Sequence, residues 1–266
     1  MNARLSKPTT VDTHFHLFDA GHAVPGARYT PGYDAQYAAW NALAAADGIA
    51  RGVLVQTSFL GTDNSRLVQE LRAHPEQLRG VAVVAPDVGA DELAELHRNG
   101  VRGVRLNLAG RLSDLDAWRG AQATWDVLLR LGWHVELHTD IGALPVVLAQ
   151  MPSALPLVVD HMGKPDAVRA GDATVQALRA RASQGRVWIK LSGPYRLGGR
   201  DARALAQLWL GELGESRLLW GSDWPFTNHE RDADYAALRR ALDDWIDEPA
   251  RGRVLSDNPL ALYWAD

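Results

Sequence analysis

Short apolar runs rich in β-branched residues recur along the chain, and longer segments whose apolar residues follow a helical period lie between them. The short runs are typical of buried strands, and the longer segments are typical of amphipathic helices. Strands are therefore predicted at residues 11–14, 52–56, 80–84, 103–107, 134–138, 157–161, 187–192 and 218–223. Helices are predicted between them, among others at residues 35–48, 64–74, 90–98, 118–131 and 234–246.

The strict alternation of strand and helix indicates a parallel sheet, because parallel strands need a long crossover connection. Eight such units suggest closure into a barrel, and 266 residues suit a fold that typically takes about 250. An open, doubly wound sheet is the alternative, but no Gly-rich phosphate-binding turn follows the first strand. We therefore predict one α/β domain over residues 1–266, a (β/α)8 TIM barrel. The long loop at residues 22–33 has a length that is often functional.

Composition narrows the function further. Hydrophobic residues make up 47% of the chain, which is enough to bury a substantial core. A net charge of −4 and the lack of runs of like charge argue against nucleic acid and membrane surfaces as partners. The chain has no cysteine, so thiolate nucleophiles and thiolate metal ligands are excluded. A metal would therefore be held by imidazole and carboxylate groups.

The first ten residues contain no apolar stretch long enough for a signal peptide, and no segment approaches the length of a membrane span. A cytoplasmic protein is therefore expected. Nothing in the composition excludes a homo-oligomer.

Residues that can carry chemistry end four of the predicted strands. In a barrel the active site lies at the carboxyl ends of the strands. The first strand leads into His14-Phe15-His16, and a spacing of two in an extended chain puts both imidazoles on one face. His138, His161 and Asp223 end the fifth, sixth and eighth strands. Four imidazoles and one carboxylate are thus expected to converge on one mouth.

This set resembles that of the amidohydrolase superfamily, whose barrels carry His-x-His on strand 1, His on strands 5 and 6, and Asp on strand 8. More narrowly, the chain resembles the amidohydrolase 2 branch that includes 2-pyrone-4,6-dicarboxylate lactonases, and the resemblance runs almost end to end. The most specific segments are His161-Met162-Gly163 and Trp220-Gly221-Ser222-Asp223-Trp224-Pro225. Further matching segments are residues 11–16, 29–31, 61–64, 100–107, 131–134, 159–166 and 257–259.

The resemblance implies hydrolysis of a small anionic lactone, similar to 2-pyrone-4,6-dicarboxylate or to a muconolactone. Two positions depart from that branch. Strand 5 ends in His138 instead of Tyr, and Leu60 stands where the loop after strand 2 has a His. Both positions are expected to face the mouth, so the identity of the lactone stays open.

Strand 4 offers Arg105 and Asn107 in place of the carboxylated Lys or the Glu that bridges two metals in binuclear relatives. A guanidinium cannot ligate a cation, so two metals are not expected. The composition of a mononuclear zinc site is met by His14, His16, His138 and Asp223. The lactonase branch, in contrast, is understood to act without metal. Both alternatives, no cofactor and one divalent metal such as Zn²⁺, stay open at this point.

Lactone hydrolysis needs an activated water, an electrophile for the carbonyl oxygen and anchors for the ring substituents. Asp223 is the predicted general base. Three imidazoles are predicted to polarise the carbonyl: His14, His16 and His161. Arginine pairs with carboxylates in a bidentate manner, so it dominates the predicted substrate-binding residues, which are Arg105, Arg111, Arg196, Tyr29, Ser58 and His138. No Gly-x-Ser-x-Gly elbow is present, which disfavours a serine hydrolase.

A zinc-dependent non-oxidative decarboxylase of an aromatic or muconate-type acid is the nearest alternative, because such enzymes of the superfamily use the same histidines and aspartate. A sugar-acid lactone hydrolase is a second alternative, although it would not need several arginines in the mouth. A non-catalytic binding protein is a third, disfavoured because no member of the polar set is missing. Release of CO2 marks a decarboxylase, whereas ring opening with release of acid marks a lactonase.

Strand alternation also predicts the layer beneath the mouth, since residues two positions apart on a strand share a face. The residues assigned to this inner layer are Asp12, Gln56, Gly103, Glu136, Val159, Lys190 and Gly221. Most barrels fill such layers with branched apolar residues, and buried charges are tolerated only when they are paired. We therefore predict a contact between Glu136 and Lys190 inside the barrel, either direct or bridged.

Overall fold

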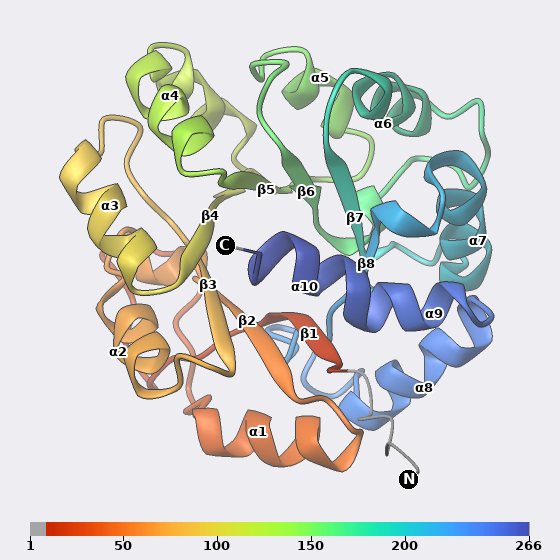
Figure 1. Ribbon diagram of the computed structural model, residues 1–266, viewed down its shortest axis with the longest axis horizontal. Coiled ribbons are helices and arrows are strands. Elements are labelled where there is room, and N and C mark those ends of the chain that lie inside the picture. Colours follow the sequence, from red (N-terminus) through yellow and green to blue (C-terminus); the bar gives the residue numbers. More distant parts are fainter. Residues whose placement is uncertain (1–8, 266) are drawn as a thin grey trace, which may run out of the picture.

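The computed structural model describes residues 9–265 and contains one sheet of eight parallel strands. Each strand pairs with the next one in chain order, and the helices surround the sheet on the outside (Figure 1). This arrangement confirms the predicted (β/α)8 barrel. The strands are β1 Val11–Phe15, β2 Arg51–Val55, β3 Leu78–Ala82, β4 Val101–Asn107, β5 His134–His138, β6 Leu157–Val159, β7 Val187–Leu191 and β8 Leu218–Trp220.

At least one helix follows each strand, and three helices follow β8. The observed helix α3 has the predicted bounds, whereas the helix predicted from residue 118 begins four residues later, because a 3-10 turn occupies Leu112–Trp118. In residues 9–265, no helix has the length and apolar character needed to cross a membrane. The helices are α1 Tyr37–Ala46, α2 Ser65–Ala73, α3 Ala90–Arg98, α4 Gln122–Arg130, α5 Leu144–Leu148, α6 Ala173–Gln184, α7 Ala202–Leu213, α8 Tyr235–Trp245, α9 Ala250–Gly252 and α10 Asn258–Tyr263.

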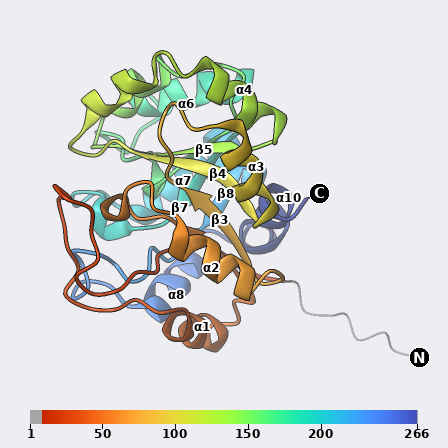
Figure 2. The same ribbon diagram turned by 90° about the vertical axis from the view of Figure 1, so that its left-hand side faces the viewer.

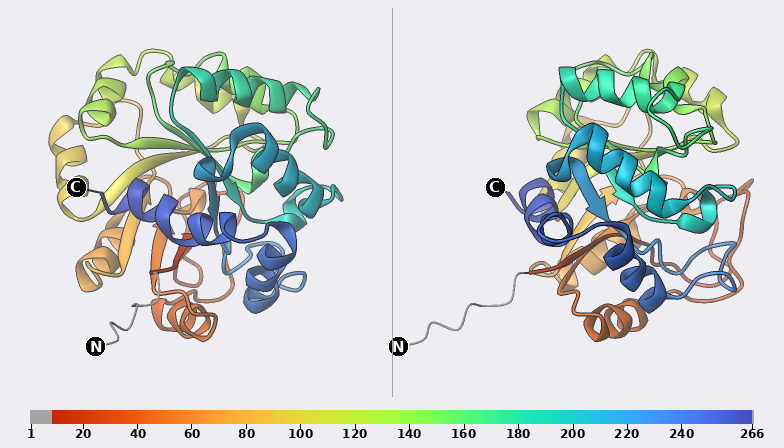
Figure 3. Two further views of the ribbon diagram at one scale, coloured as in Figure 1. Left: turned by 45° about the vertical axis from the view of Figure 1, so that its right-hand side comes forward. Right: turned by 90° about the vertical axis from the view of Figure 1, so that its right-hand side faces the viewer.

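The two ends of the barrel differ. Helix α10 lies across one end, where Tyr263 packs into an apolar cluster with side chains from β1, β2, β3, β6 and β8 (Figure 1). The loop of residues 22–33 lies on the opposite side of the molecule, as Figures 2 and 3 show from two directions. One end of the barrel is therefore closed by a helix, and the end where the strands reach their carboxyl termini carries the long loops.

The first and last strands meet at a seam. Phe15 forms an isolated parallel bridge with Trp224, and the His16 N–H donates to the carbonyl oxygen of Trp224 at 2.8 Å. The Asp223 N–H donates to the carbonyl oxygen of His14 at 2.8 Å. The barrel is thus closed by bonds between the end of β1 and the segment that follows β8.

A charged layer fills the middle of the barrel, above an apolar layer. The apolar side chains come from strands on opposite sides of the barrel, so they can meet only in its interior. Above them, Lys190 Nζ lies 2.5 Å from Glu136 Oε2, and neither side chain is exposed. The predicted Glu136–Lys190 contact is confirmed. The apolar layer consists of Val11, Val53, Val55, Val81, Val158, Leu219 and Tyr263.

The prediction that Asp12 faces the interior is wrong. Its carboxylate accepts hydrogen bonds from the indole N–H of Trp40 (3.0 Å) and the hydroxyl of Tyr235 (3.1 Å), which belong to the outer helices α1 and α8. The register of β1 against β2 shifts between Asp12 and Phe15. Such a bulge interrupts the alternation, so Asp12 and His14 point to opposite sides of the sheet.

The predictions for Val159 and Gln56 are also wrong. Val158 joins the interior cluster instead of Val159, because β6 ends at Val159 and a left-handed turn redirects His161. On β2, Val55 faces the interior, and the Gln56 side chain donates instead to the carbonyl oxygen of Asp63 at 2.7 Å. Both predictions step back two residues from a mouth residue. In both places that mouth residue lies beyond the regular strand, where alternation no longer holds.

Candidate active site

Three imidazoles and one carboxylate meet at the carboxyl ends of β1, β6 and β8. Nε2 of His14 lies 3.2 Å from Nε2 of His16, and Asp223 Oδ1 lies 3.5 and 3.4 Å from these two atoms. Nε2 of His161 lies 3.9 Å from the same oxygen. All four side chains are buried. The structure thus brings together four of the five residues that the sequence places at the mouth.

Backbone irregularities aim these side chains. The register shift in β1 places both His14 and His16 on the interior side. His161 and Asp223 adopt left-handed φ angles of 48° and 61°. Non-glycine residues rarely occupy this region, and such strain gathers at functional sites. His161 lies two residues beyond β6 and Asp223 three residues beyond β8, and at these positions the left-handed backbone directs the side chains toward the mouth.

The other ring nitrogens of His16 and His161 fix the orientation of their rings. His16 Nδ1 donates to the carbonyl oxygen of Val55 at 2.7 Å, so Nε2 is the ring nitrogen left to accept a bond or hold a ligand. His161 Nδ1 lies 3.0 Å from the hydroxyl of Ser192. In both rings Nε2 is the atom directed at Asp223.

His14 can take either tautomer. Its Nδ1 has a carboxylate oxygen of Asp160 and the ammonium of Lys190 both at 3.2 Å. If Nδ1 carries the proton and donates a hydrogen bond to Asp160, Nε2 carries a lone pair that faces the lone pair of His16. If Lys190 donates to Nδ1, Nε2 carries the proton and donates to His16. Burial lowers the pKa of His14 to about 3, so the ring is neutral at working pH.

Asp223 is held on one oxygen only. Its Oδ2 accepts bonds from Arg196 Nε at 2.6 Å and from the hydroxyl of Tyr195 at 2.8 Å. Burial raises the pKa of this carboxyl, but Arg196 and His161 outweigh burial and keep the pKa well below its usual range. Asp223 is therefore ionised, with Oδ1 directed at the imidazoles.

A charged network supports His14 from beneath. Asp160 Oδ2 accepts from Arg105 Nη2 at 2.9 Å and from Nε at 3.1 Å, and Glu136 Oε1 lies 3.5 Å from His14 Nδ1. Lys190 connects this network to both carboxylates. Burial and repulsion from Asp160 raise the pKa of Glu136. These contacts hold His14 and Arg105 in fixed positions below the mouth.

His138, a predicted metal ligand, packs edge-on against His161 with ring centroids 4.8 Å apart, but its nitrogens are directed elsewhere. Its Nδ1 faces Arg105 Nη2 at 3.3 Å, and its Nε2 faces Lys164 Nζ at 3.0 Å. Since both ring nitrogens meet cationic side chains, neither is directed at His16 or Asp223. Among the described residues, the groups suited to a metal include His14, His16 and Asp223 without His138.

The Lys164 ammonium is largely buried, which disfavours its charged form. Burial lowers the pKa of Lys164 to about 8 from its usual 10.5. Between these two values the unfolded chain binds a proton that the folded chain has lost, so the contribution of Lys164 to the free energy of unfolding rises with pH across this window. We therefore expect the free energy of unfolding of Lys164→Met, measured relative to that of the wild type, to be higher at pH 7 than at pH 9.5. Urea denaturation at both pH values measures the difference, and an equal difference at both would contradict it.

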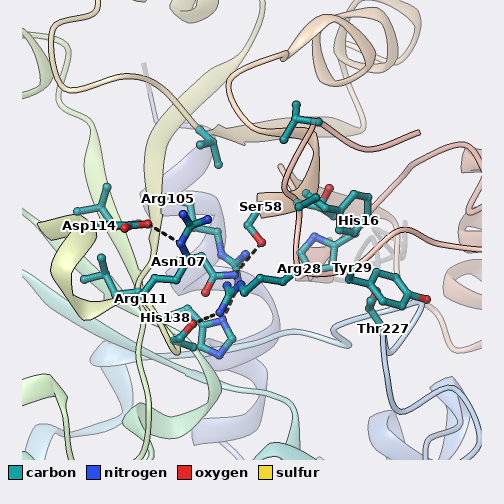
Figure 4. A pocket seen from close by; sticks show the side chains of 18 of the residues that line it. His16, Arg28, Tyr29, Ser58, Arg105, Asn107, Arg111, Asp114, His138 and Thr227 are labelled. Carbon is teal, nitrogen blue, oxygen red and sulfur yellow. Dashed lines mark hydrogen bonds and ion pairs between the residues drawn. The ribbon is translucent and has the colours of Figure 1, made fainter. Parts of the chain in front are cut away.

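The group of three imidazoles and Asp223 lies at the bottom of a cavity of about 640 Å³, within the usual range for small-molecule sites (Figure 4). On its wall the hydroxyl of Ser58 accepts a hydrogen bond from Asn107 at 3.2 Å. His14 lies beneath the floor. The predicted site residues that line the cavity are His16, Tyr29, Ser58, Arg105, Arg111, His138, His161, Arg196 and Asp223.

Each of the predicted arginine anchors already has a carboxylate partner inside the protein. Two of these pairs are buried or nearly so, whereas the third joins side chains that are about half exposed. Exposed pairs are worth little and exchange readily with solvent or ligand. The pairs are Arg105–Asp160 (2.9 Å), Arg196–Asp223 (2.6 Å) and Arg111–Asp114 (3.0 Å).

Asp160 and Lys164 belong to the site but not to the predicted set. Asp160 pairs with Arg105 beneath the mouth, and Lys164 contacts His138. Both flank His161 within the segment of residues 159–166. Both are charged residues in a segment that is otherwise buried, and buried charges need partners. This feature could have identified them as site residues.

Comparisons with known proteins show the family to which the chain belongs. A family model described as Amidohydrolase matches residues 11–264. The chain is 35% identical to a 2-pyrone-4,6-dicarboxylate hydrolase of Comamonas testosteroni, over 96% of this chain and 90% of that protein. It is 28% identical to a 4-sulfomuconolactone hydrolase of Hydrogenophaga intermedia, over 96% of this chain and 89% of that protein.

A similar solved structure is described as a probable 2-pyrone-4,6-dicarboxylic acid hydrolase from Acinetobacter baumannii with citric acid bound. It superposes with a TM-score of 0.86 at 32% identity and covers 97% of this chain and 100% of that one. The matched range of residues 11–264 contains all eight strands and every residue of the His14–His16–His161–Asp223 group. The chain belongs to the Amidohydrolase family.

Proposed function

We propose that this protein opens small lactones that carry anionic substituents, by adding water to the ring ester. The observation that carries the proposal is an ionised carboxylate, Asp223, that faces three imidazoles at the floor of a cavity with arginines on its walls. Its similarity to a 2-pyrone-4,6-dicarboxylate hydrolase and a 4-sulfomuconolactone hydrolase supports the same class of substrate.

In the proposed mechanism Asp223 acts as the general base. A water bound at its free Oδ1 loses a proton to the carboxylate while its oxygen attacks the lactone carbonyl carbon. Negative charge then develops on the carbonyl oxygen, where the Nε2–H group of His161, which lines the cavity, can donate a hydrogen bond. When the ring C–O bond breaks, Asp223 returns the proton to the leaving ring oxygen.

Three donors of this group also fit a divalent metal. The separations among His14 Nε2, His16 Nε2 and Asp223 Oδ1 are 3.2, 3.4 and 3.5 Å. Ligand distances of about 2.0–2.2 Å in a tetrahedral zinc site give separations of about 3.3–3.6 Å between ligand atoms. A metal held by these three residues would acidify a bound water and polarise a carbonyl. The His14 tautomer with a proton on Nδ1, donated to Asp160, suits this state.

A panel of lactones tests the proposal, with ring opening followed by a pH indicator. We expect acid release from lactones with one or two carboxylates and slow or absent release from neutral sugar lactones. A preference for neutral sugar lactones would favour the sugar-acid alternative. Release of CO2 from an aromatic or muconate-type acid would replace the proposal with a decarboxylase, and no turnover of any anionic lactone would contradict it.

The same panel is run on metal-stripped and zinc-reconstituted protein, with zinc binding measured by calorimetry. We expect one Zn²⁺ to bind per chain, because three suitable donors already stand at tetrahedral spacing. Binding should be lost in His16→Asn and kept in His138→Gln, which serves as the matched control. Loss of binding in His138→Gln, or no saturable binding to the wild type, would contradict the three-residue site.

A further inference from the structure

Arg28 lies in the loop of residues 22–33 and lines the cavity, yet it is not among the predicted anchors. Figure 4 shows its side chain reaching across the cavity from the side of Tyr29 toward the side of His138. Its Nη1 donates to the backbone carbonyl oxygen of Ala109, which follows β4. The guanidinium therefore bridges two loops over the mouth, far along the chain from each other.

Further hydrogen bonds hold the loop that carries Arg28. The Val24 N–H donates to the carbonyl oxygen of Phe59 at 2.8 Å. The hydroxyls of Tyr29 and Tyr33 both donate to Glu230, at 3.3 and 2.9 Å. These bonds tie the loop to the segments after β2 and β8. Arg28 is thus held over the cavity by its backbone, in addition to its own bond.

A glycine makes room for the guanidinium. A Cβ atom at Gly110 would lie 3.1 Å from Arg28 Nη1, and Gly110 has a φ of +66° that other residues rarely adopt. The Gly110 N–H donates to Asp140 at 2.7 Å, which fixes this turn. The segment after β4 is therefore shaped to receive the Arg28 side chain.

Within the part of the chain that the structure describes, the charge of Arg28 has no carboxylate counter-ion. The three other arginines of the cavity each pair with a carboxylate, whereas no carboxylate among residues 9–265 forms an ion pair with Arg28. A carbonyl oxygen is neutral, and it uses one of the five N–H donors of the guanidinium. The remaining donors match the two oxygens of a carboxylate or sulfonate. A ligand that enters the cavity can supply this anion.

We propose that Arg28 is a specificity-determining residue that binds a second anionic substituent of the lactone, on the side of the ring away from Asp223. This proposal rests on the proposed function for the identity of the ligand as a lactone. Binding of an anion by Arg28 can nevertheless be measured without any turnover. Binding of this substituent also adds a ligand contact to the bridge between the loops after β1 and β4.

The test compares two stable ring acids, isophthalate with two carboxylates and benzoate with one, by calorimetry. The proteins are the wild type, Arg28→Gln, Arg28→Lys and the control Arg119→Gln, which changes an exposed arginine outside the cavity. We expect Arg28→Gln to weaken isophthalate binding about tenfold or more, the effect of losing charge-assisted bonds, and to change benzoate binding less than about twofold. Arg28→Lys should recover part of the loss, because it keeps the charge but not the planar fork.

Equal weakening of both acids by Arg28→Gln would overturn the proposal, since the residue would then act only through the loop. Unchanged binding of isophthalate, or a wild type that binds both acids equally, would overturn it as well. For any lactone that the protein opens, Arg28→Gln should raise KM for dicarboxylated substrates and leave kcat within about twofold. Because the acids are not hydrolysed, a negative lactone panel leaves the calorimetric result intact and contradicts the proposed reaction alone.

Discussion

Asp223→Asn is expected to lower kcat by at least about a hundredfold, the usual scale for loss of a general base. The amide keeps the size of the side chain and an oxygen that can accept the bonds from Arg196 and Tyr195. It removes the negative charge that would accept a proton from water. Steady-state kinetics on the best lactone of the panel measure the loss, with isophthalate binding as a check that the cavity is intact.

Asp232→Asn is the matched control, because Asp232 is an exposed carboxylate of the same loop region whose partner is His229. It should leave kcat unchanged. Turnover of Asp223→Asn within a few-fold of the wild type would remove Asp223 from the mechanism. A parallel fall in thermal stability and in isophthalate binding would show that the carboxylate acts through the structure instead.

Lys190→Met is expected to destabilise the protein by about 3–5 kcal/mol, the cost of leaving a buried charge without its partner. Lys190 is fully buried, and it contacts Glu136 at 2.5 Å and Asp160 at 3.7 Å. Its removal leaves two carboxylates in the barrel with Arg105 as their remaining strong counter-ion. Urea denaturation measures the change in the free energy of unfolding.

A double variant separates the pair from its surroundings. Combining Lys190→Met with Glu136→Leu removes both buried charges, so the double variant should be more stable than Lys190→Met alone. The cycle gives the coupling energy between the two side chains. A loss of less than about 1 kcal/mol for Lys190→Met would show that the charged layer does not depend on this contact.

The sequence predicts the barrel well because each strand is a compact apolar run followed by a helix with a clear period. It also predicts which side chains reach the mouth, since four of them lie within three residues of the carboxyl end of a strand. His14, His16, His161 and Asp223 meet for this reason. The Glu136–Lys190 contact was predictable because β5 and β7 keep their alternation through both residues.

The errors have a common cause. Alternation fails where the backbone leaves the regular strand, as at the bulge in β1 and at the left-handed turn of His161. Asp12 and Val159 were misplaced for these reasons. The position of His138 depends on Arg105 and Lys164, which come from β4 and from the turn after β6. Contacts between side chains distant in the chain leave no periodic trace in a sequence.

The seam between β1 and β8 has a consequence for the order of assembly. His14 and His16 come from the first strand, and Asp223 follows the last, so the donor group spans the full length of the chain. Contacts of such large sequence separation are costly in chain entropy and tend to form late in folding. A partly folded barrel with seven paired strands would hold most of the core but lack this group. Recovery of activity after denaturation therefore reports closure of the barrel. Recovery of the helical circular dichroism signal reports earlier steps.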